Sequence, residues 1–254
     1  MVEDRSMIET ADHAGIAVLT LAHGPVNALD LELLTAVPEA LATVAGARAV
    51  VLTGRGRAFS AGVDLKRIVE GGPEYVERFL PALSAAALAL FEHPRPVVAA
   101  VNGHALAGGC VLAAACDARL MAGGTIGLTE LAAGVPFPTV PLEIMRHAAG
   151  PALEAMVLGA GRLDPGRAVA IGLVHEVVEP DRLLAEALRR AEALCAAPPD
   201  VYAFAKRQLR APALERVRAA RDRDDPEVLA MWSSERTHTI LRDYLAGLSK
   251  NRSQ

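Results

Sequence analysis

Residues 57–64 (RAFSAGVD) and 102–110 (NGHALAGGC) are the two stretches that decide the fold of this chain. An apolar strand is predicted directly before each stretch, at residues 49–53 and 97–101, and a helix is predicted directly after it. Glycine permits the turn from strand to helix, and the first N–H groups of a helix have no partner within it. The pattern therefore predicts an α/β fold in which two unpaired backbone N–H groups grip one carbonyl oxygen.

The same pattern also has a purely structural interpretation. Any crossover between a strand and a helix is built with a glycine turn, so either stretch taken alone favours a structural role. An oxyanion hole needs donors that are already in place where negative charge develops. Only the two stretches together point to that chemistry.

In order and spacing, the two stretches resemble the paired motifs of the crotonase superfamily, which contains the enoyl-CoA hydratases and isomerases. The resemblance covers most of the chain and includes GPVNAL at 24–29, VLTG at 51–54, AGVDLK at 61–66, CDAR at 116–119 and GLVHEVV at 172–178. It implies an α/β spiral core of repeated ββα units with a C-terminal α-helical region. It also implies an acyl-CoA thioester substrate and no cofactor, since coenzyme A is part of the substrate.

The resemblance assigns roles to individual residues. The family's oxyanion donors fall on the backbone N–H groups of Val63 and Gly108, and Glu130 is expected to be the catalytic acid and base. Lys66 is the best local cation for a CoA phosphate, with a solvated surface position as the alternative. The positions expected to contact the substrate or its CoA are Val26, Ala28, Ala61, Gly62, Asp64, Leu65 and Lys66.

Val111 departs from the hydratase pattern, because family hydratases carry a second glutamate at this position, three residues after the donor glycine. Hydration requires an oriented water, which here loses one of two carboxylate partners, whereas one carboxylate suffices to move a proton between carbons. Residues 126–130 and 134–137 also resemble the delta3,delta2-enoyl-CoA isomerases. The sequence therefore favours a shift of a 3-enoyl-CoA double bond to trans-2-enoyl-CoA. An apolar site should also raise the pKa of Glu130.

Two other functions remain open. A weak enoyl-CoA hydratase, or another enolate chemistry on a CoA thioester, would use the same scaffold. A non-catalytic acyl-CoA-binding subunit is an alternative of a different class, and the missing carboxylate at Val111 supports it. Glu130 argues against a binder, because an unpaired carboxylate is costly to bury and a binder has no use for one.

Composition sets outer limits on function. The chain has 254 residues, of which 52% are hydrophobic, and a formal net charge of −4. This balance gives no electrostatic case for nucleic acid or for an anionic membrane surface. Cys110, Cys116 and Cys195 lack metal-ligand spacing and are too few for a disulfide framework. We expect no metal, no signal segment, no membrane span and a cytoplasmic location.

The chain is expected to divide into a spiral core with the active site, residues 1–190, and a helical oligomerisation region, residues 191–254. By analogy with the family, this region would assemble a homotrimer or a dimer of trimers. Separate helices are predicted at residues 200–209, 214–222 and 226–245, because proline interrupts helices.

Five other residues have competing interpretations. His104 is expected to be a hydrogen-bonded loop residue, with general acid as the alternative. Asp117 and Arg119 are expected to form a structural pair at the start of a strand. Tyr244, like Trp232, is expected to pack in the core or an interface, or else to line a neighbour's pocket.

Overall fold

The structure is a computed structural model that describes residues 7–251. Its larger sheet has six strands in the order β1-β2-β3-β5-β7-β10, which are parallel apart from the antiparallel β1–β2 hairpin. The strands are β1 (Ile8–His13), β2 (Ile16–Leu21), β3 (Ala49–Gly54), β5 (Val97–Val101), β7 (Ala118–Met121) and β10 (Glu176–Val177). The apolar runs of β3 and β5 suit this position, because strands of a parallel sheet are covered on both faces.

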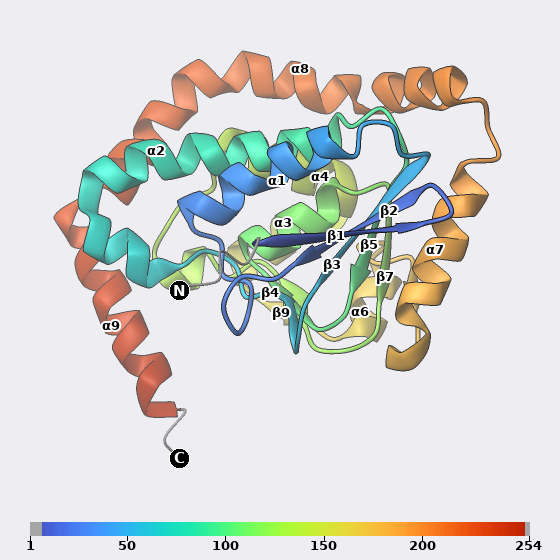
Figure 1. The fold of residues 1–254 in the computed structure, drawn as a ribbon. Coiled ribbons are helices and arrows are strands. Elements are labelled where there is room, and N and C mark those ends of the chain that lie inside the picture. The colour runs from blue at the N-terminus through green and yellow to red at the C-terminus, as the bar shows by residue number, and fades with distance from the viewer. Residues whose placement is uncertain (1–6, 252–254) are drawn as a thin grey trace, which may run out of the picture.

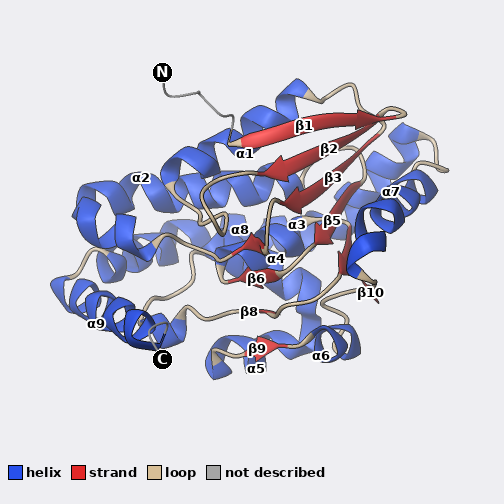
Figure 2. Ribbon diagram, turned by 60° about the horizontal axis from the view of Figure 1, so that its bottom comes forward, coloured by secondary structure: helices blue, strands red, loops and turns tan. Residues whose placement is uncertain are grey.

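A second, smaller sheet lies beside the first and has the order β4-β6-β8-β9 (Figure 2). Its strands are β4 (Ala58–Ser60), β6 (His104–Leu106), β8 (Ile126–Gly127) and β9 (Arg162–Leu163). Strands β4, β6 and β8 each follow shortly after a strand of the larger sheet, and a helix comes next. This repetition is the ββα spiral that the sequence predicted.

Helices cover both faces of the larger sheet (Figure 1). The side chains of α7 pack against one face, while α1 to α4 and α8 enclose the main core on the other. The helices are α1 (Leu31–Thr43), α2 (Leu65–Phe91), α3 (Gly108–Ala115), α4 (Thr139–Ala149), α5 (Leu153–Gly159), α6 (Pro165–Ala170), α7 (Leu183–Leu194), α8 (Pro199–Trp232) and α9 (Glu235–Asn251). Short 3-10 turns are η1 (Leu131–Ala133), η2 (Gly150–Ala152) and η3 (Pro180–Arg182). None of the described helices has both the length and the apolar character needed to cross a membrane.

The helical tail differs from the sequence prediction. One helix, α8, continues through Pro212 and Pro226, where breaks were expected. Its packing on α4, with Val217 and Val228 buried, supplies tertiary stabilisation that outweighs the loss of backbone hydrogen bonds at proline. The helix ends instead after Trp232, and the Ser234 hydroxyl accepts a hydrogen bond from the N–H of Thr237 in the first turn of α9.

Helices α8 and α9 pack on α4 and α2, and the predicted domain boundary at residue 190 falls inside α7. A role of residues 191–254 in oligomerisation stays a prediction.

Asp117 joins this tail to the core, and the expected pair of Asp117 with Arg119 is wrong. The Asp117 carboxylate accepts hydrogen bonds from Lys206 Nζ and from a guanidinium nitrogen of Arg210, each at a distance of 2.7 Å. Both cationic side chains are almost fully buried. Arg119 donates instead to backbone carbonyls, including those of Leu173 and Cys116. Lys206 and Arg210 lie one turn apart on α8, so Asp117 ties this helix to the start of β7.

Removing Asp117 should therefore destabilise the protein strongly. Asp117→Ala leaves two buried cations without their anion, and breaking a buried pair in this way typically costs about 3–5 kcal/mol of unfolding free energy. Urea denaturation measures this loss. Asp224→Ala, which breaks an exposed pair with Arg223, is the matched control and should leave the midpoint unchanged. Equal midpoints for the two variants would contradict the role given to Asp117.

Candidate active site

Asn27 fixes the loop that precedes α1. It is fully buried with φ at 50°, a left-handed conformation that asparagine tolerates better than most residues. Its amide nitrogen donates to the carbonyl oxygens of Arg55, Ala58 and Phe59 at 3.0–3.2 Å. The Ser60 hydroxyl donates back to the Asn27 carbonyl at 2.7 Å. These bonds hold the loop of residues 24–29 against the first glycine turn.

The two glycine turns meet directly. Gly62 has φ at 88°, and a Cβ there would lie 2.6 Å from the carbonyl oxygen of Leu106 and 3.0 Å from Cβ of Ala107. A Cβ on Gly109 would lie 2.6 Å from the carbonyl oxygen of Ser60. No other residue fits at these contacts without moving backbone, so glycine is what allows the turns to approach this closely.

The N–H of Val63 is left open by the hydrogen bonds around it. A parallel bridge joins Leu29 and Val63: the Leu29 N–H donates to the Gly62 carbonyl at 2.8 Å, and the Asp64 N–H donates to the Leu29 carbonyl at 2.9 Å. This pattern engages the groups on either side of Val63 but not its own N–H. Within the described residues, the Val63 N–H has no hydrogen-bond partner.

The N–H of Gly108 is open for a different reason. Gly108 is the first residue of α3, where no carbonyl one turn earlier is available. Ala107 before it is held at φ 49° and ψ −124°, a conformation that costs energy for a residue with a Cβ. Such strain persists where the surrounding structure fixes it, and here it orients the turn that carries the second donor.

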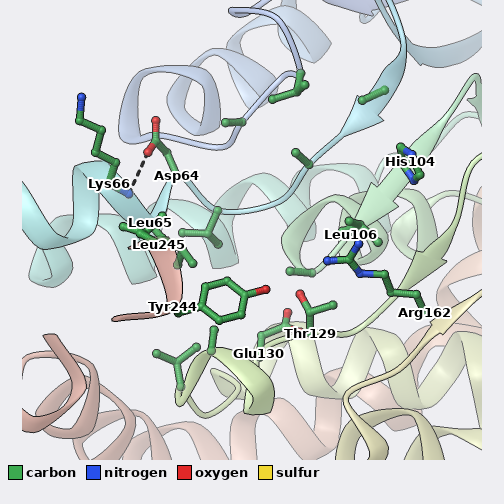
Figure 3. A pocket seen from close by; sticks show the side chains of 18 of the residues that line it. Asp64, Leu65, Lys66, His104, Leu106, Thr129, Glu130, Arg162, Tyr244 and Leu245 are labelled. Carbon is green, nitrogen blue, oxygen red and sulfur yellow. Dashed lines mark hydrogen bonds between the residues drawn. The ribbon is translucent and has the colours of Figure 1, made fainter. Parts of the chain in front are cut away.

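A cavity of about 600 Å³ opens at this meeting point (Figure 3). Gly62 and Gly108 lie in the backbone beside the cavity walls. The structure thus brings together residues that span more than 100 positions of sequence. Of the residues that the sequence assigned to the site, those lining the cavity are Val26, Ala28, Ala61, Val63, Asp64, Leu65, Lys66 and Glu130.

Glu130 places a buried carboxyl group in this cavity. It follows β8 at the start of η1 and is 8% exposed, and its Oε2 atom has no hydrogen-bond partner in the part of the chain that the structure describes. Burial penalises the charged form and raises the pKa of Glu130 to about 8, although backbone hydrogen bonds at Glu130 and Thr129 offset part of this effect. The carboxyl group therefore holds its proton near neutral pH and is poised to exchange it.

A second available carboxylate is absent from the cavity lining among residues 7–251. Val111 is buried in α3, all of whose side chains pack in the core. Asp64 lines the cavity, but its carboxylate caps α2 by accepting the N–H groups of Lys66 and Arg67 at 3.1 Å. Nor do three or more His, Cys, Asp or Glu side chains gather in the described chain so as to hold a metal ion.

The helical tail supplies part of the cavity wall. The sequence did not settle whether its residues line the cavity of their own chain. Trp232 at the end of α8 and Tyr244 and Leu245 on α9 line the cavity of their own chain. Figure 3 shows Tyr244 beside Glu130, with Arg162 on the opposite side. Spacing along the sequence carries no signal for these residues, because they reach the cavity only through the packing of α8 against α2 and α4 and of α9 against α2 and η1.

His104 and Lys66 occupy the cavity margin. His104 is the exposed first residue of strand β6 and not a loop residue, and its Nδ1 atom is 3.0 Å from the Thr125 hydroxyl. Lys66 has a side chain that is 75% exposed, with Nζ 3.6 Å from a Glu70 oxygen. Both positions allow contact with a ligand that extends from the cavity into solvent.

The raised pKa of Glu130 predicts how stability depends on pH. The native carboxyl keeps its proton up to about pH 8, whereas the unfolded one loses it near its model value of 4.5, so unfolding releases a proton between these values. The contribution of Glu130 to the unfolding free energy should therefore fall as pH rises from about 4.5 to 8. Urea denaturation of wild type and Glu130→Gln measures this difference. Glu227→Gln, an exposed control on α8, should follow the wild-type slope, and a Glu130→Gln slope equal to wild type would contradict the assignment.

Comparison with known proteins agrees with this geometry. Residues 11–241 match the family described as enoyl-CoA hydratase/isomerase. Human mitochondrial enoyl-CoA delta isomerase 1 is 29% identical over 256 residues, covering 98% of this chain and 85% of that protein. A putative enoyl-CoA hydratase of Thermus thermophilus is 40% identical over 151 residues, covering 58% of this chain and 60% of that protein.

The fold is similar to that of a solved structure from the same family. A crystal structure of human mitochondrial delta3-delta2-enoyl-CoA isomerase superposes with a TM-score of 0.91 at 27% identity, covering 97% of this chain and 99% of the other. The ββα spiral, the two converging glycine turns and the family match over residues 11–241 are one consistent set. This chain therefore belongs to the enoyl-CoA hydratase/isomerase family.

Proposed function

We propose that the protein shifts the double bond of a 3-enoyl-CoA to give trans-2-enoyl-CoA. The observation that carries this proposal is Glu130, a single buried carboxyl group with a pKa raised to about 8 in a cavity that two open backbone N–H groups adjoin. The proposal is also supported by similarity in sequence to human enoyl-CoA delta isomerase 1 and in structure to human delta3-delta2-enoyl-CoA isomerase.

The reaction needs one base and one oxyanion site. The Glu130 carboxylate removes a proton from C2, and the electrons of the broken C–H bond move onto the thioester oxygen. The N–H groups of Val63 and Gly108 stabilise the negative charge of this dienolate. Glu130 then returns its proton to C4, the enolate electrons reform the carbonyl, and the double bond lies between C2 and C3. No atom is gained or lost.

Hydration is the second candidate, because relatives such as the Thermus thermophilus protein carry the name hydratase. It adds water across the double bond and needs that water held on the correct face. In this chain the position of the second family glutamate is Val111, whose side chain is buried in the core. The geometry thus favours proton transfer over water addition, and a non-catalytic acyl-CoA binder would leave the unpaired Glu130 carboxyl unexplained.

The CoA part of the substrate would extend from the first glycine turn toward solvent. We assign its contacts to the walls formed by Val26, Ala28 and the residues from Ala61 to Lys66. Lys66 is free to turn toward a phosphate, since its ion pair with Glu70 is exposed and therefore weak. The cytoplasmic location stays a prediction.

Assembly into a homotrimer or a dimer of trimers is part of the proposal. Three apolar side chains near the start of α8 are exposed in the single chain: Val201, Phe204 and Leu209, the last at 70%. Apolar side chains gathered on one helix are typical of contact surfaces between subunits.

Glu130→Gln should abolish isomerisation while keeping the shape of the site. Loss of a positioned acid–base group typically lowers kcat by about 10²- to 10⁴-fold. The assay follows the conjugated thioester absorbance with 3-enoyl-CoA, and in parallel the hydration of trans-2-enoyl-CoA, with Glu227→Gln as control. Dominant hydration by wild type would favour the hydratase. Binding of acyl-CoA without turnover, at an affinity insensitive to Glu130→Gln, would favour the binder.

The pH dependence of catalysis tests the protonation state of Glu130. The base must be ionised to accept the C2 proton, so kcat/KM should rise with pH and level off above the pKa of about 8. Measurement from pH 5 to pH 9 at constant ionic strength shows the inflection. A flat profile across this range would contradict the role of Glu130 as base.

A further inference from the structure

We propose that Trp232 closes the inner end of the acyl site and restricts the protein to short-chain 3-enoyl-CoA substrates. This inference rests on the proposed function and adds the substrate class to it. The apolar tail of a thioester held at the Val63 and Gly108 turns has to continue past Glu130. The apolar part of the cavity lining includes Ala133, Val135 and the indole ring of Trp232.

Trp232 is held too firmly to move aside. It is the last residue of α8 and is only 1% exposed. Its Nε1 atom donates to the carbonyl oxygen of Pro136 at 2.9 Å. Its ring packs against that of Phe79 on α2 with centroids 6.3 Å apart. A hydrogen bond at one edge and an aromatic contact on its ring fix the indole as a rigid wall.

A second cavity of about 370 Å³ is lined by residues next to those that hold Trp232. Val228 lies one turn before Trp232 on α8, Pro138 lies two residues after Pro136, and Leu80 directly follows Phe79. Apolar surface forms most of the lining of this second cavity, to which Glu77, Arg221, Asp222 and Asp225 also contribute. In this proposal, the indole of Trp232 separates the catalytic cavity from a space large enough to take additional methylene groups.

The consequence is a step in chain-length preference. Each methylene that enters an apolar site raises kcat/KM by about fourfold, until the chain reaches a wall that does not yield. In the wild type this wall is the indole of Trp232. A smaller residue at 232 would join the two cavities and move the limit outward.

The test compares 3-hexenoyl-CoA with 3-dodecenoyl-CoA in wild type, Trp232→Ala, Trp232→Leu and Trp232→Phe. The ratio of kcat/KM for the long over the short substrate should be below one in wild type and rise on the order of tenfold or more in Trp232→Ala. Trp232→Leu should raise it less, and Trp232→Phe should stay near wild type because a ring remains. Met231→Ala, an exposed neighbour on α8, is the matched control and should not change the ratio.

A wild type that turns over both substrates equally well would overturn the proposal, as would a folded Trp232→Ala with an unchanged ratio. Calorimetric binding of saturated acyl-CoAs, from butyryl to hexadecanoyl, tests the same limit without turnover or mutation. Affinity should rise with length and then stop. If the affinity stops rising with chain length but neither substrate is isomerised, the chain-length limit stands and the proposed reaction fails. If the affinity rises up to hexadecanoyl-CoA, Trp232 does not limit the chain length.

Discussion

The structure depends on the contact between two turns that lie about 45 positions apart in the chain. Gly62 packs against Leu106 and Ala107 so closely that a methyl group would displace the backbone. This approach sets Val63 and Ala107, the residue before Gly108, on the wall of the same cavity. It also explains the strain at Ala107 and the buried network of Asn27, since both hold a backbone that would otherwise relax apart. The α/β spiral serves here to bring these turns together.

Burial of Glu130 is the second constraint. Its carboxyl group is almost fully buried and, among the described residues, finds neither a cation nor a full set of hydrogen-bond donors. Burying a carboxyl group without hydrogen-bond partners lowers the stability of the folded protein. The energetic cost is consistent with a site in which proton transfer matters more than stability, as expected where pKa values are strongly shifted.

The sequence predicted the fold because its signals are local: apolar strands run directly into glycine turns. The roles of Val63, Gly108 and Glu130 came from the resemblance of these motifs to a known family and stay predictions, which the position of Val63 and Glu130 on one cavity supports. The strands β4 and β6 were missed because three residues are too few for a period to show. The unbroken α8, the partners of Asp117 and the placement of Trp232 and Tyr244 depend on long-range packing, which propensity and spacing do not encode.

Helix α9 has a consequence for how the protein is made. It packs against α2 and lines the cavity with Tyr244 and Leu245, although α2 precedes it by more than a hundred residues (Figure 1). During synthesis the core strands and α2 emerge first, and domains generally begin to fold from the N-terminal side. The nascent core therefore exposes an incomplete apolar cavity until α9 docks. The cavity is therefore completed late in biosynthesis, after most of the buried core has formed.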